Sequence, residues 1–497
     1  MQNRVLRFAA VIGAIVAAAC VEHAPVSPNG NASPAGGLTM QLSTATTGTL
    51  STLSGESGRY LIVFKPGRTA GPAITDELRT SGGQLEGLHE QLGFAVVSGI
   101  TPDAAGRLAK ASAVSSVEPD VEFAIEPMTD AEALDAVDLG TESATAPQTA
   151  ALFARQWNMR AIRADAAWAG GFLGSSTVSV AILDTGIDYL WPDLNGRVDL
   201  TRSISLRPDE DARQQTWFGA LNRHHITDLN GHGTLVSSIV ASNSGFFAGV
   251  TTRTMLFGVK VCTVFNRCST AAILNGIVYA VDHGADVINM SLGGAFFKNL
   301  APGFVSVINS VFNYANKRGT LIVVSAGNEA ADIDHTGNLY FRYCDAPHVV
   351  CVSATGPTAA PTANGPFTNP DAIALYTNFG RSAISLAAPG GGVTTANAFV
   401  SGPCSSTALR LNAAGTIILG PLCPLPGRFL LRGAGTSFSS PHVAGVAAAL
   451  VAVVGPGNPA QIRAILQNSA DDLGDPGTDP FYGKGRLNSG RAMGVLP

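Results

Sequence analysis

The sequence predicts an α/β protein with a mostly parallel, doubly wound sheet, preceded by a small ferredoxin-like α+β domain. Three observations lead to this prediction. Short apolar segments alternate with longer apolar ones from about residue 155 onward, as in sheets covered by helices on both faces. A second, shorter alternation of strands and helices comes before it. The chain has 497 residues with 46% hydrophobic and 13% charged residues, which suits two packed units and excludes wholesale disorder.

The larger unit, residues 155–497, shows the alternation most clearly. Its apolar segments differ in length, and we assign the short ones to buried strands and the long ones to helices. In chain order they are Val178–Leu183, Thr234–Ala241, Met255–Val261, Thr270–His283, Val287–Ser291, Phe304–Arg318, Leu321–Ser325 and Val349–Ala354. Long loops are expected at 201–229, 356–374 and 396–432, and long loops in compact domains are often functional.

The smaller unit, residues 58–127, has the strand and helix order βαββαβ. Strands are predicted near 59–66, 93–100 and 114–121, and helices over 73–80 and 102–110. This order is that of a ferredoxin-like fold. Residues 128–154 are acidic and rich in Ala and Thr, so we expect an exposed linker between the two units.

The N-terminal 19 residues have the features of a signal peptide. Arg4 and Arg7 precede an apolar stretch from Phe8 that ends in small residues at Ala19, and the stretch is too short for a stable membrane span. Cys20 follows directly, which resembles the lipidation site of bacterial lipoproteins; ordinary cleavage after Ala19 is the alternative. Residues 20–57 are rich in Ser, Thr, Gly, Pro and Ala and are interpreted as a flexible tether.

A serine follows Gly435 and Thr436 just before an Ala/Val-rich run that ends at Val454. A helix beginning here would put Ser437 near free backbone N–H groups, which favour a developing negative charge. Pro441 suits the first turn of such a helix because it has no N–H to pair. Taken alone, Gly-Thr-Ser is also a common helix cap.

Three further polar residues stand where chemistry is expected. Asp184 ends a predicted parallel strand, at the edge where open α/β sheets bind ligands. His232 lies between two glycines and opens a predicted helix. Asn328 follows another predicted strand, where its amide could donate to an oxyanion. Each has an ordinary alternative, since Asp and Asn often form turns and a lone His is often structural.

Together these residues resemble the subtilisin-like serine peptidases, or subtilases. The order Asp, His, Ser is that of subtilisin. The nucleophile elbow of esterases and lipases has a Gly two residues after its serine, and this chain lacks a Gly two residues after Ser437, which argues against that class. The resemblance implies that Ser437 is the nucleophile, His232 the general base, Asp184 its orienting acid and Asn328 an oxyanion donor. The matching motifs are 184–186, 232–234, 326–328 and 435–437, with support from 284–294, 387–390 and 483–487.

The same resemblance extends to substrate binding and to the smaller unit. It implies that Ser291, Leu292 and Gly293 pair with the substrate backbone, as an edge strand free of obstructing side chains can. It also implies that Ser325, Ala326 and Gly327 contact the side chain before the cleaved bond. Residues 58–127 would be a prodomain that assists folding and blocks the cleft, with cleavage between 127 and 156.

The sequence departs from the family pattern at two positions. Leu235 replaces a second histidine that the family usually has, which we interpret as a packing change. Phe438 stands where Met is common after the nucleophile. Because Met is oxidised to a sulfoxide and Phe is not, this predicts resistance to peroxide.

Seven cysteines are present, and removing Cys20 leaves six in three local couples. Six cysteines allow 15 connectivities, but the clustering favours bonds between nearest neighbours, as expected for an exported protein. Metal binding is the rival interpretation, although no couple has CxxC spacing. The expected disulfides are Cys262–Cys268, Cys344–Cys351 and Cys404–Cys423.

The remaining expectations concern partners and cofactors. The net charge of −5 and the absence of a basic cluster exclude a nucleic-acid partner, and membrane contact is expected only through a lipid on Cys20. Catalysis needs no cofactor, but family resemblance allows structural calcium at Asp193, where a turn or cap is the alternative. We therefore expect a monomeric enzyme exported from a bacterial cell, either secreted or lipid-anchored, that cleaves polypeptides. A catalytically dead scaffold and an ester hydrolase are the competing hypotheses.

Overall fold

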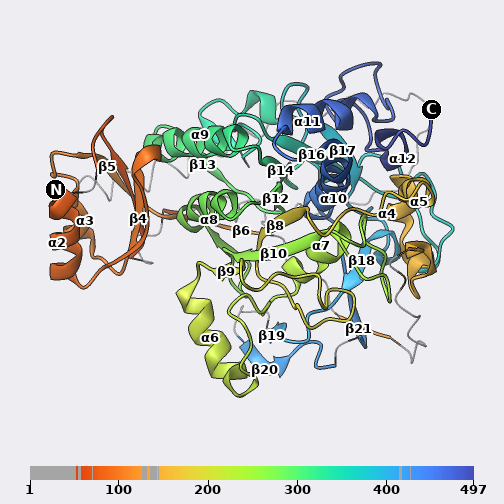
Figure 1. The fold of residues 1–497 in the computed structure, drawn as a ribbon, viewed down its shortest axis with the longest axis horizontal. Coiled ribbons are helices and arrows are strands. Elements are labelled where there is room, and N and C mark those ends of the chain that lie inside the picture. Colours follow the sequence, from red (N-terminus) through yellow and green to blue (C-terminus); the bar gives the residue numbers. More distant parts are fainter. Residues whose placement is uncertain are drawn as a thin grey trace, which may run out of the picture. The chain divides into compact units, whose positions relative to one another are not determined.

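A computed structural model describes residues 52–53, 58–69, 71–125, 131–134, 143, 145–341, 343–412, 417–425 and 427–497. The predicted signal peptide, Cys20 and nearly all of the tether lie outside these residues. The larger unit is built on a seven-stranded sheet in which every neighbouring pair is parallel (Figure 1). Its strands, in spatial order, are β17 (Leu386–Pro389), β16 (Val350–Thr355), β14 (Leu321–Ser325), β12 (Val287–Met290), β8 (Ser179–Asp184), β10 (Met255–Lys260) and β9 (Ile204–Ser205).

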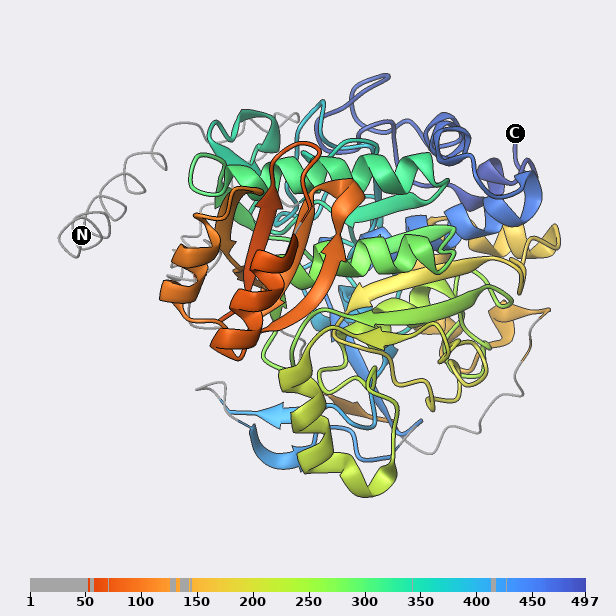
Figure 2. The same ribbon diagram turned by 60° about the vertical axis from the view of Figure 1, so that its left-hand side comes forward.

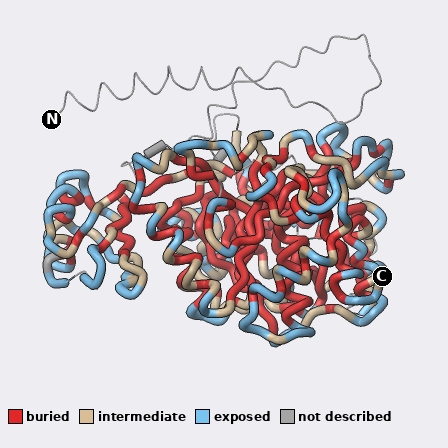
Figure 3. Tube along the Cα trace, turned by 90° about the horizontal axis from the view of Figure 1, so that it is seen from above, coloured by how far each residue is buried: buried red, intermediate tan, exposed pale blue. Residues whose placement is uncertain are grey.

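Helices cover both faces of this sheet, as predicted. Strand β8 shows why, because its side chains alternate between two cores. Val180 and Ile182 belong to one core, together with residues of α7 (His232–Val240) and α10 (Thr436–Val454). Ala181 and Leu183 belong to the other, with residues of α8 (Thr270–Asp282) and α9 (Pro302–Lys317). The buried stretches of the chain concentrate around these layers (Figure 3).

The smaller unit has the ferredoxin-like order βαββαβ, although the sequence analysis named no segment for its second strand, β3. Its antiparallel sheet has the order β3-β4-β2-β5, with α2 and α3 connecting the strands. The sheet packs against α8 and α9 of the larger unit (Figure 2). The elements are β2 (Tyr60–Phe64), α2 (Gly71–Ser81), β3 (Gln84–His89), β4 (Phe94–Ser98), α3 (Pro102–Leu108) and β5 (Val114–Pro119).

Two predicted loops contain regular structure. The segment 201–229 includes helix α6 (Pro208–Phe218), and 396–432 includes strands β18 (Val400–Pro403), β19 (Leu409–Leu411), β20 (Ile417–Pro421) and β21 (Phe429–Gly433). The remaining strands are β1 (Thr52–Leu53), β6 (Val121–Ala124), β7 (Glu132–Ala133), β11 (Arg267–Ser269), β13 (Ala295–Phe297) and β15 (Leu339–Phe341). The remaining α-helices are α4 (Trp157–Ala161), α5 (Ala164–Ala169), α11 (Pro459–Asn468) and α12 (Ser489–Ala492). Short 3-10 helices span Glu90–Leu92, Pro147–Thr149, Phe153–Arg155, Gly219–Leu221, Ile333–His335 and Ala396–Ala398.

The predicted linker is less exposed than expected where the structure describes it. Strand β7 pairs with β21, and Leu152 is buried in a cluster with Phe246, Phe247 and Leu430. Packing of the larger unit therefore begins before residue 155, because these apolar side chains complete one of its small cores.

Helix α10 begins earlier than the apolar run suggests. Pro441 is the sixth residue of the helix rather than part of its first turn, so the expectation for Pro441 was wrong. A proline here leaves the carbonyl of Ser437 without the usual partner four residues on. The Ser291 hydroxyl donates to that carbonyl at 2.6 Å instead. Within the described ranges, α10 alone is long and apolar enough to span a membrane, but it is mostly buried inside the protein.

Candidate active site

Asp184 and His232 meet at the carboxyl edge of the sheet. Asp184 is the last residue of β8 and His232 the first of α7, and each side chain is 1% exposed. The distance between His232 Nδ1 and Asp184 Oδ1 is 2.7 Å. A neutral imidazole that donates its Nδ1–H to this carboxylate carries a lone pair on Nε2 and can accept a proton there.

Ser437 lies in the first turn of α10, a helix that packs against α7. Its hydroxyl donates to the Ser291 carbonyl at 3.2 Å, and its side chain is buried. The following residue, Phe438, has its ring centroid 5.7 Å from that of His232. The structure therefore places the predicted nucleophile at a helix N-terminus, where the backbone dipole favours negative charge.

Asn328 is oriented by the same helix start. Its Oδ1 accepts hydrogen bonds from the Thr436 backbone N–H at 2.8 Å and from the Thr436 hydroxyl at 3.0 Å. The Thr436 hydroxyl in turn accepts from the Gly327 N–H at 2.9 Å. With Oδ1 held in this way, the amide donates through Nδ2.

The segment 291–294 follows β12, and its first residue is hydrogen-bonded to Ser437. The Ser291 side chain is turned inward, because its hydroxyl bonds to the Ser437 carbonyl while its own carbonyl accepts from Ser437. Leu292 is buried and Gly293 has a φ of 153°, which favours glycine. Ser325, Ala326 and Gly327 are also buried, at the end of β14 beside α10.

Strand β6 of the smaller unit packs against segment 291–294. Strand β6 pairs antiparallel with β11, and the Ile125 N–H donates to the Asn266 carbonyl. Its other edge pairs with β1, and the Phe123 side chain lies against Gly294, where an added Cβ would come within 2.5 Å of it. The strand therefore lies between β1 and β11 in a three-stranded sheet, with the Phe123 side chain against the segment that carries the Ser291 carbonyl.

Two carboxylates next to β6 attach it to the larger unit. Glu118 accepts from the Gly303 and Phe304 N–H groups at 2.7 and 3.0 Å, and so caps α9. Asp120 accepts from the Ala271 N–H at 2.9 Å at the start of α8. Burial raises the pKa of Asp120 to about 6, although its hydrogen bonds and Arg59 oppose this shift. The sequence analysis did not predict a capping role for either carboxylate.

The described chain matches the model of the subtilase family over residues 175–485. This span covers most of the sequence and includes Asp184, His232, Asn328 and Ser437.

The chain belongs to the subtilase family.

Known relatives agree with this assignment. Subtilisin of Bacillus pumilus is 30% identical over 329 residues, which cover 66% of this chain and 94% of that protein. The thermophilic serine proteinase of Bacillus sp. strain AK1 is 27% identical over 323 residues, covering 64% of this chain but only 62% of that longer protein. The crystal structure of the epidermin leader peptide processing serine protease from Staphylococcus aureus shares the fold, with a TM-score of 0.62 at 19% identity. That likeness covers 88% of this chain and 98% of the other. The protein is therefore a serine endopeptidase of the subtilisin type.

Three disulfides of this subtilase are confirmed as predicted. They join Cys262 to Cys268, Cys344 to Cys351 and Cys404 to Cys423. The first closes a loop that carries β11, the strand that pairs with β6. The third joins the end of β18 to the segment after β20.

Asp193 does not have the surroundings of a calcium ligand. Its carboxylate accepts from the backbone N–H groups of Gly245, Phe246 and Phe247 at 2.8, 3.0 and 2.8 Å. A ring of N–H donors is suited to an anion and repels a cation. The described residues also contain no cluster of three or more His, Cys, Asp or Glu side chains that could hold a metal. The residues present at Asp193 therefore do not fit calcium, and the carboxylate caps the 243–247 turn instead.

The two departures from the family pattern lie in packed positions. Leu235 is fully buried in the core beside α10, and a Cβ at Gly402 would come within 2.6 Å of its side chain. Phe438 is 3% exposed and lies against Gly433, where a Cβ would meet its ring at 2.4 Å. Both residues therefore fill space next to the site without donating to it.

Proposed function

We propose that this subtilase hydrolyses peptide bonds with Ser437 as nucleophile, His232 as general base and Asp184 as the group that orients the imidazole. The observation that carries the proposal is the 2.7 Å contact between His232 and Asp184 beside a serine in the first turn of a buried helix. Asn328 completes the set as an oxyanion donor.

The proposed reaction follows from the roles of these atoms. Ser437 Oγ attacks the scissile carbonyl carbon while His232 Nε2 takes its proton. The carbonyl oxygen becomes an oxyanion, stabilised by the Asn328 amide and the Ser437 N–H. The imidazolium, held by Asp184, then protonates the leaving amine as the C–N bond breaks. Water, deprotonated by His232, releases the acyl group and restores Ser437.

We further propose that the enzyme is made as a zymogen whose residues 58–127 act as its own inhibitor. The pairing of β6 with β11 and the contact of Phe123 with Gly294 support this, because a peptide that binds along the same edge would have to displace β6. Cleavage between residues 127 and 156 would separate the two units. Export is supported by the signal-like N-terminus and the three disulfides. If Cys20 carries a lipid, that lipid anchors the prodomain, and the mature enzyme is retained only while the two remain associated.

A fluorophosphonate probe tests the proposed nucleophile. The processed parent should be labelled, whereas Ser437→Ala should be neither labelled nor processed. Mass spectrometry of the mature parent gives the new N-terminus and the state of Cys20. Absence of labelling in a processed parent would favour the catalytically dead scaffold. Faster turnover of short esters than of any peptide, on the scale of kcat/KM, would favour the ester hydrolase.

A further inference from the structure

The carboxylate of Asp228 is fully buried and accepts five hydrogen bonds. Its Oδ1 accepts from the N–H groups of Asn230 and Gly231, both at 2.9 Å, and from the Thr185 hydroxyl at 2.9 Å. Its Oδ2 accepts from the Thr234 N–H at 2.9 Å and from the Thr234 hydroxyl at 2.6 Å. The donors therefore come from two separate parts of the chain.

These two parts carry the proposed acid and base. Thr185 directly follows Asp184, while Gly231 and Thr234 flank His232. A further hydrogen bond closes the connection, since the Gly233 N–H donates to the Thr185 hydroxyl at 3.0 Å. One carboxylate thus fixes the turn after β8 relative to the start of α7.

Close backbone packing makes this connection stiff. A Cβ at Gly233 would come within 2.2 Å of the Gly186 carbonyl oxygen, and one at Gly186 within 3.0 Å of the Asp228 Cα. The two turns therefore touch without intervening side chains. A small displacement of either turn would change the His232 to Asp184 distance directly.

We propose that Asp228 is a positioning residue for catalysis, which holds Asp184 and His232 at hydrogen-bonding distance. This inference rests on the proposed roles of that pair. A helix cap alone would explain the bonds to Gly231 and Thr234, but not the bond to Thr185, which is 43 residues away in sequence. Such outer contacts matter because misplacing a reacting group by about 1 Å can cost roughly 100-fold in rate.

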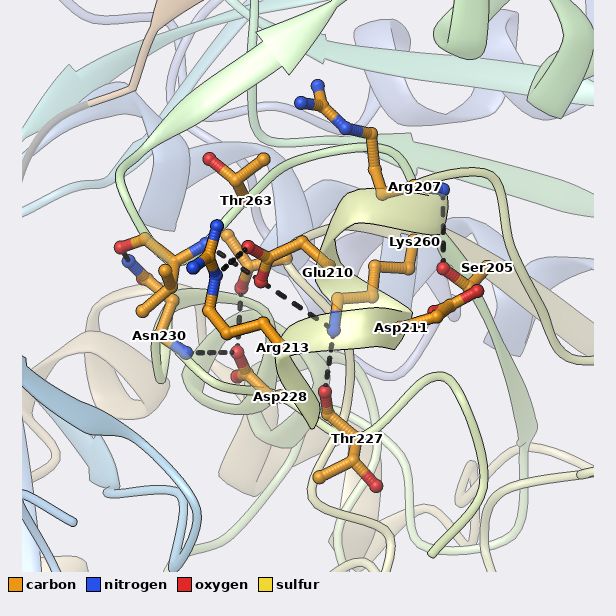
Figure 4. A network of polar contacts seen from close by, with 12 residues as sticks. Ser205, Arg207, Glu210, Asp211, Arg213, Thr227, Asp228, Asn230, Lys260 and Thr263 are labelled. Atoms are coloured by element: carbon orange, nitrogen blue, oxygen red, sulfur yellow. Dashed lines mark hydrogen bonds and ion pairs between the residues drawn. The ribbon is translucent and has the colours of Figure 1, made fainter. Parts of the chain in front are cut away.

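A second network of buried polar side chains holds the turn that contains Thr227 and Asp228 (Figure 4). Lys260, the last residue of β10, donates from Nζ to the Thr227 carbonyl at 2.8 Å and lies 4.0 Å from Glu210 Oε2. Glu210, in the first turn of α6, also accepts from Arg213 at 2.9 Å. Burial lowers the pKa of Lys260, whereas Glu210 and Asp228 raise it. Thr227, the residue before Asp228, is therefore attached to β10 of the sheet and, through Lys260 and Glu210, to helix α6.

Asp193 offers a matched control for these contacts. It too is a fully buried aspartate that accepts three backbone hydrogen bonds, but those bonds go to Gly245, Phe246 and Phe247 and not to the turns beside the triad. Loss of a buried carboxylate should cost stability in both variants. Only the loss of Asp228 should change the chemistry.

The test compares Asp228→Asn, Thr185→Val, Thr185→Ser and Asp193→Asn with the parent, each normalised to the concentration of active sites. We expect Asp228→Asn and Thr185→Val to lower kcat by about 10- to 100-fold while KM changes less than about twofold. Thr185→Ser keeps the hydroxyl and should restore most of the rate. Asp193→Asn should keep the parent kcat.

The pH profile separates positioning from general instability. The Asp184 contact stabilises the imidazolium, so loosening it should move the acid limb of kcat/KM to lower pH by about half a unit or more. Thr185→Val tests this without removing a charge, and it decides the matter if Asp228→Asn does not fold. If Thr185→Val keeps both the kcat of the parent and its acid limb, the inference is overturned. A parent that the fluorophosphonate probe does not label would instead overturn the proposed function.

Discussion

His442, in the middle of α10, predicts a specific loss of stability in mild acid. The side chain is fully buried, with Nδ1 2.7 Å from the Phe438 carbonyl oxygen and Nε2 2.9 Å from Asn158 Nδ2. Burial lowers its pKa from 6.5 to about 4, although the bond to Phe438 opposes the shift. The folded protein therefore keeps this imidazole neutral under conditions in which the unfolded chain protonates it.

The sign and size of the change in the free energy of unfolding follow from this difference in pKa between the folded and unfolded states. Between pH 6.5 and 4 the unfolded state binds more protons, so the free energy of unfolding falls as the pH falls. A shift from 6.5 to about 4 corresponds to a full loss of about 3 kcal/mol. At pH 5, where most carboxylates are still ionised, about 2 kcal/mol of this is already lost. Above pH 6.5 the contribution is fully present.

The assay measures the free energy of unfolding of the inactive Ser437→Ala protein by urea titration at pH 7 and pH 5. The unfolding and refolding curves must overlap, which shows that the transition is reversible. The same measurement on Ser437→Ala/His442→Gln isolates the effect, because glutamine does not titrate. We expect the pH-dependent loss to be about 2 kcal/mol smaller in that double variant. Replacing His225, whose side chain is 67% exposed, provides the control and should leave the loss unchanged. Equal losses with and without His442 would refute the reasoning.

Four further outcomes are expected. Asn328→Ala should lower kcat by about 10²–10³-fold with little change in KM, and a loss below tenfold would remove Asn328 from the oxyanion site. Glu118→Gln should speed the appearance of probe-labelled mature enzyme by about fivefold, because a charged cap on α9 is weakened; an unchanged or slower time course would contradict this. Phe438→Met should lose activity in peroxide faster than the parent, and equal losses in a residual-activity assay would end that hypothesis. A chelator should leave the melting temperature of Ser437→Ala unchanged; a fall of several degrees that Asp193→Asn abolishes would show calcium at Asp193.

The sequence predicted the sheet and the positions of the polar residues at its edge because both follow local rules. Asp184 ends a run of apolar residues and His232 starts one, so each can be placed at the end of an element without knowing its neighbours. The disulfides were predictable for a similar reason, since each couple is close in sequence. In the ferredoxin-like unit, two helices and three of the four sheet strands were placed from local patterns, whereas β3 (Gln84–His89) was missed.

Contacts between distant segments could not be predicted in this way. Glu118 bonds to residues 185 and 186 positions away, and the five hydrogen bonds that Asp228 accepts come from two separate turns. Pro441 shows how a local rule can fail. It suits a first turn, but α10 begins at Thr436, and the carbonyl left without a helical partner is bonded by Ser291. Helix α6 is polar and lies in a segment whose composition resembles a loop.

Glu118 and Asp120 also fix the position of β6, the strand of the proposed inhibitor, along the larger unit. Each holds the N-terminus of a different helix, α9 and α8, and only Pro119 separates them. Sliding β6 by one residue along β11 would break both attachments at once. In the proposed zymogen, these two carboxylates, and not the side chains of the cleaved segment, would set which peptide reaches Ser437. The proposed self-cleavage would then keep its position even where the residues after β6 change.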